Sequence, residues 1–279
     1  MALTDLAKTI EMATCSDMGR VRTNNEDAVL ANPQLGLAVL ADGMGGYNAG
    51  EVASAMATAM LGSELEHAFL QRAPHVPGAG GHAWARAAMV EAISRANAAI
   101  CQAAQSNPKY AGMGTTLVAV QFYDNRLCVA HVGDSRLYRL RAGALAQLTR
   151  DHSFLQEQID SGMLTPEQAR HAQNRNLVTR ALGVEMSVAV EANEYEALPG
   201  DVYLLCSDGL NDMLADDEIG LALTTLSANP ALCATHLVEM ANDNGGRDNV
   251  SVILAKILKP YPATSAATGW WGRVRAWFG

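Results

Sequence analysis

The chain has 279 residues, of which 49% are hydrophobic and 18% are charged, and its formal net charge is −9. This size and composition predict one large folded domain with a sizeable core rather than two domains. The acidic balance excludes a nucleic-acid backbone as the main partner, because that partner requires a basic face.

Five cysteines indicate reduced thiols rather than a disulfide framework, because their number is odd and none forms a Cys-x-x-Cys pair. They are Cys15, Cys101, Cys128, Cys206 and Cys233. The first eleven residues lack an apolar stretch, so no signal peptide is predicted. No segment is long and apolar enough to span a membrane, and we therefore expect a cytoplasmic protein.

The first half of the chain is predicted to contain a strand and two long helices. The apolar run Leu35–Ala41 is typical of a strand that ends at Asp42-Gly43. A helix is expected after Gly50, with one apolar stripe formed by Val52, Met56 and Ala59. A second helix is expected from about Trp84 to Ala104, with a stripe formed by Met89, Ile93, Ala96 and Ile100.

The second half is predicted to contain several strands and two helices with clear start signals. The strands are Thr116–Phe122, Leu127–Val132, Leu137–Leu140, Leu145–Leu148, Val202–Cys206 and a run with Val250, Val252 and Leu254. Ala142-Gly143 predicts a hairpin turn. Thr165-Pro166 with Gln168 forms a capping box, and Asn229-Pro230 starts a helix that Gly245 or Gly246 should end. Hairpin-linked strands with grouped helices favour an α+β sandwich of antiparallel sheets.

Aspartate beside glycine or asparagine recurs where the predicted strands end. The pairs are Asp42-Gly43, Gly133-Asp134, Asp208-Gly209 and Asp248-Asn249. Each pair alone is typical of an ordinary turn. Together, each after a β-type run, they are expected to converge at one edge of the sandwich, where such carboxylates require cations to stay ionised. Oxygen ligands favour Mg²⁺, Ca²⁺ or Mn²⁺, and no His/Cys cluster in the sequence indicates zinc.

The segment 16–27 contains an arginine close to further acidic residues. Arg22 has the rigid fork that suits a phosphate, and Glu26 and Asp27 follow closely. On a strand, Arg22 and Glu26 would share one face. Taken alone, these residues are more typical of a solvated polar strand.

With these motifs in family order over residues 10–258, the chain resembles the bacterial form of the type 2C metal-dependent serine/threonine phosphatases. The matching stretches are SDMGRVRTNNEDA (16–28), ADGMGGYNAGEVAS (41–54), GMGTTLVAV (112–120), HVGDSRLYRL (131–140), LTRDHS (148–153), LLCSDGLNDML (204–214) and GGRDNVSVIL (245–254). The resemblance implies a four-layer α-β-β-α sandwich with two central, mainly antiparallel sheets. It also implies a catalytic domain at 1–258 with a flap at about 151–191, followed by a linker and an aromatic, basic tail at 259–279.

The resemblance also implies roles for the matched residues. Asp42 would bridge two metal ions, the Gly43 carbonyl would bind one of them, and Asp208 and Asp248 would bind the other. Glu26 and Asp27 would hold metal-bound waters, and Asp134 would join Asp208 at a weaker third metal site. Arg22 would bind the substrate phosphate, so that Arg22 and Asp42 are the expected catalytic residues.

The implied reaction is hydrolysis of phosphoserine or phosphothreonine on proteins by a water that bridges two Mn²⁺ or Mg²⁺ ions. The implied partners are phosphoproteins and a cognate bacterial Ser/Thr kinase, and the implied state is a monomer. The chain departs from animal members at Met44, where they carry histidine. The group that protonates the leaving oxygen is therefore open between a metal-bound water and His152, although His152 is more typical of a structural partner of its strand.

Several other functions fit the sequence less well. A thiolate phosphatase is excluded, because no arginine stands six residues after any cysteine. The Gly43-Met44-Gly45-Gly46 run lacks the further glycine of a dinucleotide site, since Asn48 occupies that position. A calcium module would need dense D-x-D-x-D-G spacing. A catalytically silent phosphatase-like binding domain is the remaining alternative, although the metal-binding aspartates are all present.

The last ten residues, 270–279, hold three of the four tryptophans of the chain, together with Arg273 and Arg275. Two interpretations of this tail stay open. It forms either an amphipathic contact with a membrane surface or a partner, or a segment that folds back on the domain.

Overall fold

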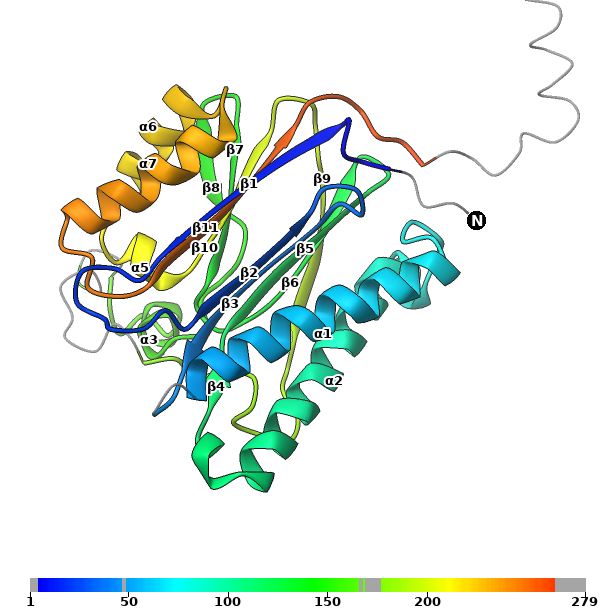
Figure 1. Ribbon diagram of the computed structural model, residues 1–279. Coiled ribbons are helices and arrows are strands. Elements are labelled where there is room, and N and C mark those ends of the chain that lie inside the picture. Colours follow the sequence, from blue (N-terminus) through cyan, green and yellow to red (C-terminus); the bar gives the residue numbers. More distant parts are fainter. Residues whose placement is uncertain (1–4, 47–48, 166–167, 169–176, 264–279) are drawn as a thin grey trace, which may run out of the picture.

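Two antiparallel sheets lie face to face and carry helices on both outer sides (Figure 1). The computed structural model describes residues 5–46, 49–165, 168 and 177–263. Within these ranges one sheet has the strand order β1-β11-β10-β7-β8, and the other has the order β2-β3-β5-β6-β9, with β4 beside β3. The predicted α-β-β-α sandwich is therefore confirmed.

The strands of the two sheets alternate along the chain, so both sheets are built from both halves of the sequence. The first sheet consists of β1 (Ile10–Asp17), β11 (Val250–Ile257), β10 (Val202–Cys206), β7 (Arg136–Arg141) and β8 (Ala144–Gln147). The second consists of β2 (Asp27–Asn32), β3 (Leu37–Met44), β4 (Gly114–Thr115), β5 (Leu117–Tyr123), β6 (Arg126–Val132) and β9 (Glu191–Glu196).

The helices form the two outer layers of the sandwich. The second sheet is covered by α1 (Ala49–Gln71) and α2 (Trp84–Ser106), and the first by α6 (Asp216–Leu226) and α7 (Pro230–Asp243). Shorter helices lie in the connections between these elements: η1 (Ala79–Gly81), η2 (Pro108–Tyr110), α3 (Phe154–Asp160) and α5 (Asp208–Asn211).

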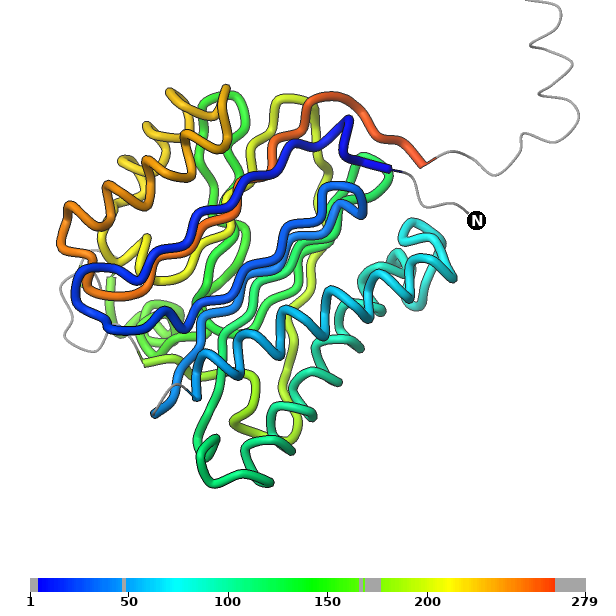
Figure 2. Tube along the Cα trace, in the orientation of Figure 1, coloured from blue at the N-terminus to red at the C-terminus, as the bar shows by residue number. Residues whose placement is uncertain are grey.

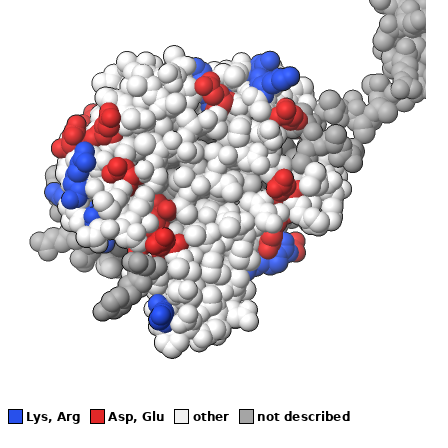
Figure 3. Space-filling model, viewed as in Figure 1, with Lys and Arg blue, Asp and Glu red and all other residues white. Residues whose placement is uncertain are grey.

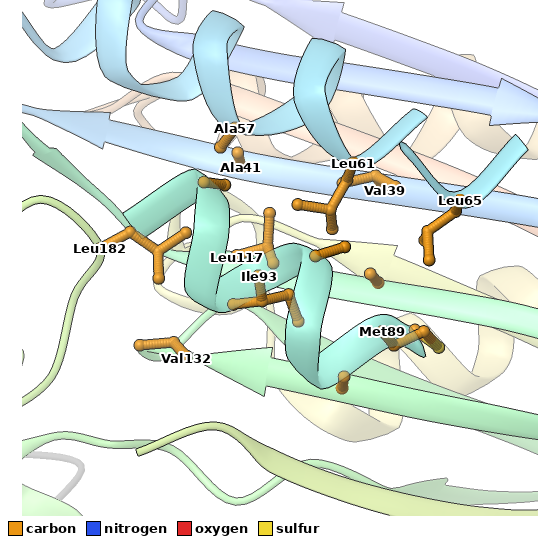
Figure 4. Packing of buried hydrophobic residues seen from close by; sticks show 14 of the residues in the cluster. Val39, Ala41, Ala57, Leu61, Leu65, Met89, Ile93, Leu117, Val132 and Leu182 are labelled. Carbon is orange, nitrogen blue, oxygen red and sulfur yellow. The ribbon is translucent and has the colours of Figure 1, made fainter. Parts of the chain in front are cut away.

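The buried face of α1 differs from the predicted stripe. Ala59 is exposed, whereas Ala53, Ala57, Leu61 and Leu65 are buried against the sheet. Figure 4 shows Leu61 and Ala57 beside Val39 and Ala41 of β3. The small alanines allow the helix to lie close to the sheet, so they occupy the buried face. The larger Val52 and Met56 are only half-buried. The stripe predicted for α2 is confirmed, since Met89, Ile93, Ala96 and Ile100 are all buried.

The two sheets pack on each other through a second apolar layer. Side chains from both sheets meet there, including Leu40 and Val120 from one and Leu205 and Ile253 from the other. The rings of Phe122 and Tyr203 meet edge to face with centroids 5.4 Å apart. This layer holds the inner faces of the sheets together and fixes which strand ends lie side by side.

Local signals in the sequence correctly predicted the hairpin and the helix starts. Arg141 pairs with Ala144, and the two residues between them both have positive φ, 50° for Ala142 and 80° for Gly143. The Asn229 side chain accepts a hydrogen bond from the Leu232 amide at the start of α7. Thr165 and Gln168 exchange the two hydrogen bonds of a capping box, whereas Pro166 and Glu167 lie outside the described residues.

The N-terminal strand lies beside the last strand of the sandwich, as Figure 2 shows. β1 pairs with β11 in an antiparallel register from Ile10↔Ile257 to Asp17↔Val250. The prediction that Arg22 and Glu26 sit on a strand is wrong, because residues 18–26 form the loop that connects β1 in one sheet to β2 in the other. Gly19 has a φ of 82° and its amide donates to Oδ1 of Asp17 at 2.8 Å, so the chain leaves the extended conformation directly after β1.

The charged side chains on the face seen in Figure 3 lie in small, separate groups. None of the helices in the part of the chain that the structure describes is both long enough and apolar enough to cross a membrane. The predicted tail, residues 270–279, lies outside the described residues, as does most of the linker before it.

Candidate metal and phosphate site

One cavity of about 380 Å³ opens at the end of the sandwich where both sheets present acidic strand ends. The lining includes most of the residues that the sequence singled out: Arg22, Glu26, Asp42, Gly43, Asp134, Asp208 and Asp248. The other lining residues are Thr23, Asn24, Met44, Gly45, Thr116, Val178 and Asn249. A second cavity of about 490 Å³ also has Asp134 and Asp208 in its lining, so the two cavities are neighbours at those acids.

Strand ends from both sheets place the four aspartates around this cavity. Asp42 lies near the end of β3, Asp134 follows β6 and Asp208 follows β10. Asp248 precedes its strand, β11, as the predicted run of Val250, Val252 and Leu254 implies, so the expectation that every pair follows a β-type run is wrong for this one. Since β11 runs antiparallel to β10, its start lies next to the end of β10 and so brings Asp248 to the same edge.

Gly43 allows the first helix to come close to the site. A Cβ atom at this position would lie 2.2 Å from the Gly50 carbonyl oxygen and 2.6 Å from that of Glu26. The Gly43 amide also donates to the Glu26 carbonyl at 3.1 Å. Any side chain at Gly43 would therefore push apart β3, the start of α1 and the loop that carries Glu26.

Asp27 lies behind the cavity instead of lining it. It pairs directly with Asp42 in the register of β2 and β3. Its Oδ2 accepts a hydrogen bond of 2.8 Å from the Ser207 hydroxyl, while its Oδ1 is buried and lacks a hydrogen-bond partner among the described residues. The unpartnered Oδ1 of Asp27 thus belongs to the cross-strand partner of Asp42, where a cation or an ordered water would satisfy it.

Arg22 and Asp248 form an ion pair at the mouth of the cavity. The Nη2 atom of Arg22 lies 2.6 Å from Oδ2 of Asp248, and the arginine side chain is 56% exposed. The pKa of Arg22 is raised, first by this hydrogen bond. The guanidinium thus stands where it reaches both the acidic site and a solvent-borne anion.

Burial and mutual repulsion raise the pKa values of several acids at the site. Burial raises the pKa of Asp42 well above its usual range, and the charges of Asp27 and Asp208 raise it further. The pKa of Asp208 is also raised well above its usual range, first by burial and then by the charge of Asp134. Burial raises the pKa values of Asp27 and Asp134 to about 6. Carboxylates with such interactions are stabilised in their ionised form only when a positive charge lies among them.

Two cavity-lining residues without a predicted role, Thr116 and Asn249, hold other site residues in place. The hydroxyl of Thr116 accepts a hydrogen bond from the Asp42 amide at 3.2 Å, and the Thr116 amide donates to the Asp42 carbonyl at 2.9 Å. The Asn249 side chain accepts from the Glu26 amide at 2.8 Å and donates to the carbonyls of Met18 and Asn24. Thr116 and Asn249 both lie inside the matching blocks, but only the three-dimensional contacts reveal their roles.

Met44 and His152, the candidate proton donor, differ in location. Met44 lines the cavity. His152 is 6% exposed, is not among the residues that line this cavity, and stacks on His131 with ring centroids 4.7 Å apart. Burial, followed by the charges of His131 and Arg180, lowers the pKa of His152 to about 4. His152 also lies outside the strands, in the segment between β8 and α3.

The donor set fits hard divalent cations. It consists of carboxylates and a backbone carbonyl, and it includes the unpartnered Oδ1 of Asp27 beside acids whose charges repel one another. Oxygen-only sites of this kind suit Mg²⁺ and Mn²⁺.

Known proteins that are similar to this chain include several phosphatases. A family model described as protein phosphatase 2C matches residues 19–257. The serine/threonine protein phosphatase PstP of Mycobacterium tuberculosis is 42% identical over 250 residues, which cover 89% of this chain and 45% of that protein. The serine/threonine phosphatase stp of Listeria monocytogenes is 37% identical over 248 residues, which cover 86% of this chain and 93% of that protein. The chain thus spans about half the length of the first relative and nearly all of the second.

Solved structures show the same fold. A crystal structure of Mycobacterium tuberculosis PstP matches with a TM-score of 0.79 and 43% identity, over 90% of this chain and 99% of that one. The catalytic domain of PstP in complex with two manganese ions matches with a TM-score of 0.76 and 41% identity, over 90% and 99% of the respective chains.

Proposed function

The chain belongs to the protein phosphatase 2C family, and from this premise we propose that it hydrolyses phosphoserine and phosphothreonine on proteins. The observation that carries the proposal is the cavity in which Asp42, Asp208 and Asp248 meet Arg22. The alternative of a catalytically silent binding domain is not supported, because the relatives are named as phosphatases.

The acidic residues of the site would bind metal ions, and Arg22 would bind the substrate phosphate. Asp42, the Gly43 carbonyl, Asp208 and Asp248 would hold two divalent cations, and Asp134 would join Asp208 at a third position. Glu26 and Asp27 would hold metal-bound waters. When bound, these ions supply positive charge at the phosphoryl group and activate a water as the nucleophile. The PstP structure that contains two manganese ions supports Mn²⁺ as the first ion to test, with Mg²⁺ as the second.

Arg22 would bind the phosphoryl oxygens of the substrate. Its guanidinium is half-exposed and pairs with Asp248, so it is oriented toward the acids and open to solvent. A planar fork of donors matches two phosphoryl oxygens at once. As negative charge shifts toward the leaving oxygen, Arg22 stays fixed and stabilises the remaining oxygens.

The surroundings of the site support further parts of the proposal. The segment 151–191 would form a flap beside the cavity, since Val178 lines it. The domain boundaries would be 1–258 for the catalytic unit and 259–279 for the linker and tail. The five cysteines are all free, which supports a reducing compartment such as the cytoplasm. A cognate Ser/Thr kinase would supply the phosphoproteins, and the enzyme would act as a monomer.

The test is a metal titration of phosphopeptide turnover. A phosphothreonine and a phosphoserine peptide are incubated with the chelated protein, and released phosphate is measured as Mn²⁺ or Mg²⁺ is added. We expect no turnover in EDTA and full turnover with Mn²⁺. Equal turnover after exhaustive chelation, or no turnover with either ion, would overturn the proposal.

A further inference from the structure

The backbone of Gly133, just before Asp134, is held by His152 through both of its peptide groups. The His152 amide donates to the Gly133 carbonyl at 2.9 Å, and the Gly133 amide donates to Nδ1 of His152 at 3.1 Å. Gly133 has a φ of 104°, and a Cβ atom there would lie 2.6 Å from that of Thr116. The peptide that leads into Asp134 is therefore fixed between Thr116 on one side and His152 on the other.

The His152 ring is fixed in turn from several directions. It stacks on His131 at an interplanar angle of 17°, and Nε2 of His131 donates to the Arg150 carbonyl at 2.9 Å. Nε2 of His152 lies 3.6 Å from Oε2 of Glu191. Because Nδ1 accepts the Gly133 amide, the neutral ring carries its proton on Nε2, whose neighbours are Oε2 of Glu191 and Nη1 of Arg180, the latter at 3.4 Å. The ring is thus an oriented hydrogen-bond acceptor for the turn.

The same residue also ties the segment 177–182 to the site. The Thr179 amide donates to the His152 carbonyl at 2.8 Å, and the next residue, Ser153, forms a β-bridge with Val178. Val178 lines the cavity, and Leu182 forms a bridge with Thr115, whose hydroxyl donates to the Asp42 carbonyl. His152 therefore links the Asp134 turn to the proposed flap through its main chain and its side chain together.

A metal site at these histidines is the competing interpretation. His131, His152 and Glu191 each offer a ligand atom within 4.8 Å of the others, and Nδ1 of His131 is buried without a partner among the described residues. The stacked rings, however, have their nitrogen lone pairs in nearly parallel planes, so the pairs cannot converge on one ion. Nδ1 of His152 is already occupied by the Gly133 amide. The geometry therefore favours a role in positioning.

We propose that His152 is a positioning residue, whose Nδ1 acceptor fixes the Gly133-Asp134 turn and so presents the Asp134 carboxylate to a divalent cation. This inference rests on the proposed function, because Asp134 is a metal ligand only in that proposal. It gives His152 a role that needs no proton transfer to the leaving group. The neutral, buried ring is suited to accept a hydrogen bond and unsuited to act as an acid near pH 7.

Three substitutions at this position separate the possible roles. In His152→Asn the amide oxygen takes the place of Nδ1, so the acceptor is kept. In His152→Gln the side-chain amide takes the place of Nε2, so the acceptor at Nδ1 is lost. In His152→Ala the groups at both Nδ1 and Nε2 are lost. His236→Ala, an exposed histidine on α7, is the matched control.

Mn²⁺ binding is measured by calorimetry and phosphopeptide turnover by phosphate release, with melting followed by circular dichroism. Loss of a residue that orients a metal ligand typically weakens metal binding about 10–100-fold, and we expect that loss at the weakest Mn²⁺ site for Ala and Gln. We expect Asn and the control to bind Mn²⁺ like the wild type. If the Ala variant does not fold, the comparison of Asn with Gln carries the test.

Two results would overturn the inference. One is wild-type Mn²⁺ binding in both the Ala and the Gln variants. The other is an Asn variant that binds Mn²⁺ normally but loses turnover along with one limb of its pH profile, which would make His152 an acid. Failure of the wild type to release phosphate with Mn²⁺ would contradict the proposed function instead, and calorimetry would still test the positioning of Asp134.

Discussion

Asp27 and Asp42 face each other as direct partners in the register of β2 and β3, so adjacent strands place two carboxylates at the same end of the sheet. A cross-strand pair of like charges is unfavourable in the absence of a cation. The arrangement therefore makes the stability of the metal-free protein depend on protonation.

The first prediction concerns the pH dependence of that stability. Burial raises the pKa of Asp27 from 3.8 to about 6 in the folded protein. The folded state thus holds a proton that the unfolded chain has lost, and the contribution of Asp27 to stability is present below about pH 4 and lost as the pH rises to about 6. In EDTA, Asp27→Asn should show a smaller decrease in melting temperature than the wild type between these pH values.

Glu66→Gln, at an exposed position of α1, is the control for Asp27→Asn and should melt in parallel with the wild type. Saturating Mn²⁺ should raise the melting temperature most above pH 6, because ligands bind the ion in their ionised form. Parallel melting curves for Asp27→Asn and the wild type in EDTA would contradict this account.

The second prediction concerns Arg22. Replacing Arg22 with alanine should lower kcat/KM for a phosphopeptide by about 10–100-fold, because a hydrogen bond to a charged group contributes roughly 1.5–3 kcal/mol. Arg22→Lys should recover only part of the loss, since lysine lacks the fork. Steady-state kinetics provide the measurement, and Arg20→Ala, an exposed neighbour outside the cavity lining, should leave kcat/KM unchanged.

The third prediction separates activity from stability at Asp208. In Asp208→Asn, turnover should fall by about 10³-fold or more, because several kcal/mol of charge stabilisation is lost with the metal ligand. In EDTA the same variant should melt at or above the wild-type temperature, because burial and neighbouring acids disfavour its charge. Asp217→Asn, at an exposed position on α6, should change neither quantity. A variant that melts lower in EDTA would show that Asp208 is not under electrostatic strain.

The fourth prediction concerns the loop that carries Arg22 and Glu26. Asn249→Ala removes one acceptor and two donors that hold this loop, so it should destabilise the protein by about 1–3 kcal/mol and also weaken Mn²⁺ activation. Asn229→Ala is a matched control, because loss of the α7 cap costs about 1 kcal/mol at a distance from the acids. Urea unfolding and Mn²⁺ titration give both quantities. Equal Mn²⁺ activation in the two variants would show that Asn249 does not position the loop.

The sequence predicts the central strands well because they are buried on both faces and read as continuous apolar runs. β5 and β10, for example, are buried along their whole length. β1, β2 and β9 escaped prediction because they lie at sheet edges and mix polar with apolar residues, as in the half-buried DAVLAN of β2. An edge strand is defined by the strand with which it pairs, and the local sequence carries little information about that pairing.

The site was predictable only as far as motifs mark individual residues. Each Asp-Gly pair indicates a turn, and the family resemblance supplies their order, but the support comes from distant contacts. Ser207 donates to Asp27 across 180 positions, and Asn249 accepts from Glu26 across 223. Local patterns do not encode such distances. For the same reason, the loop conformation of Arg22 emerged only from the structure.

The pairing of β1 with β11 has a consequence for synthesis. Arg22 and Asp248 come from opposite ends of the sandwich sequence, and they meet only after the last strand has joined the first. A nascent chain that has not yet released β11 from the ribosome therefore lacks both the ion pair and one of the acids. Newly made molecules would stay inert toward phosphorylated neighbours until translation has passed this strand.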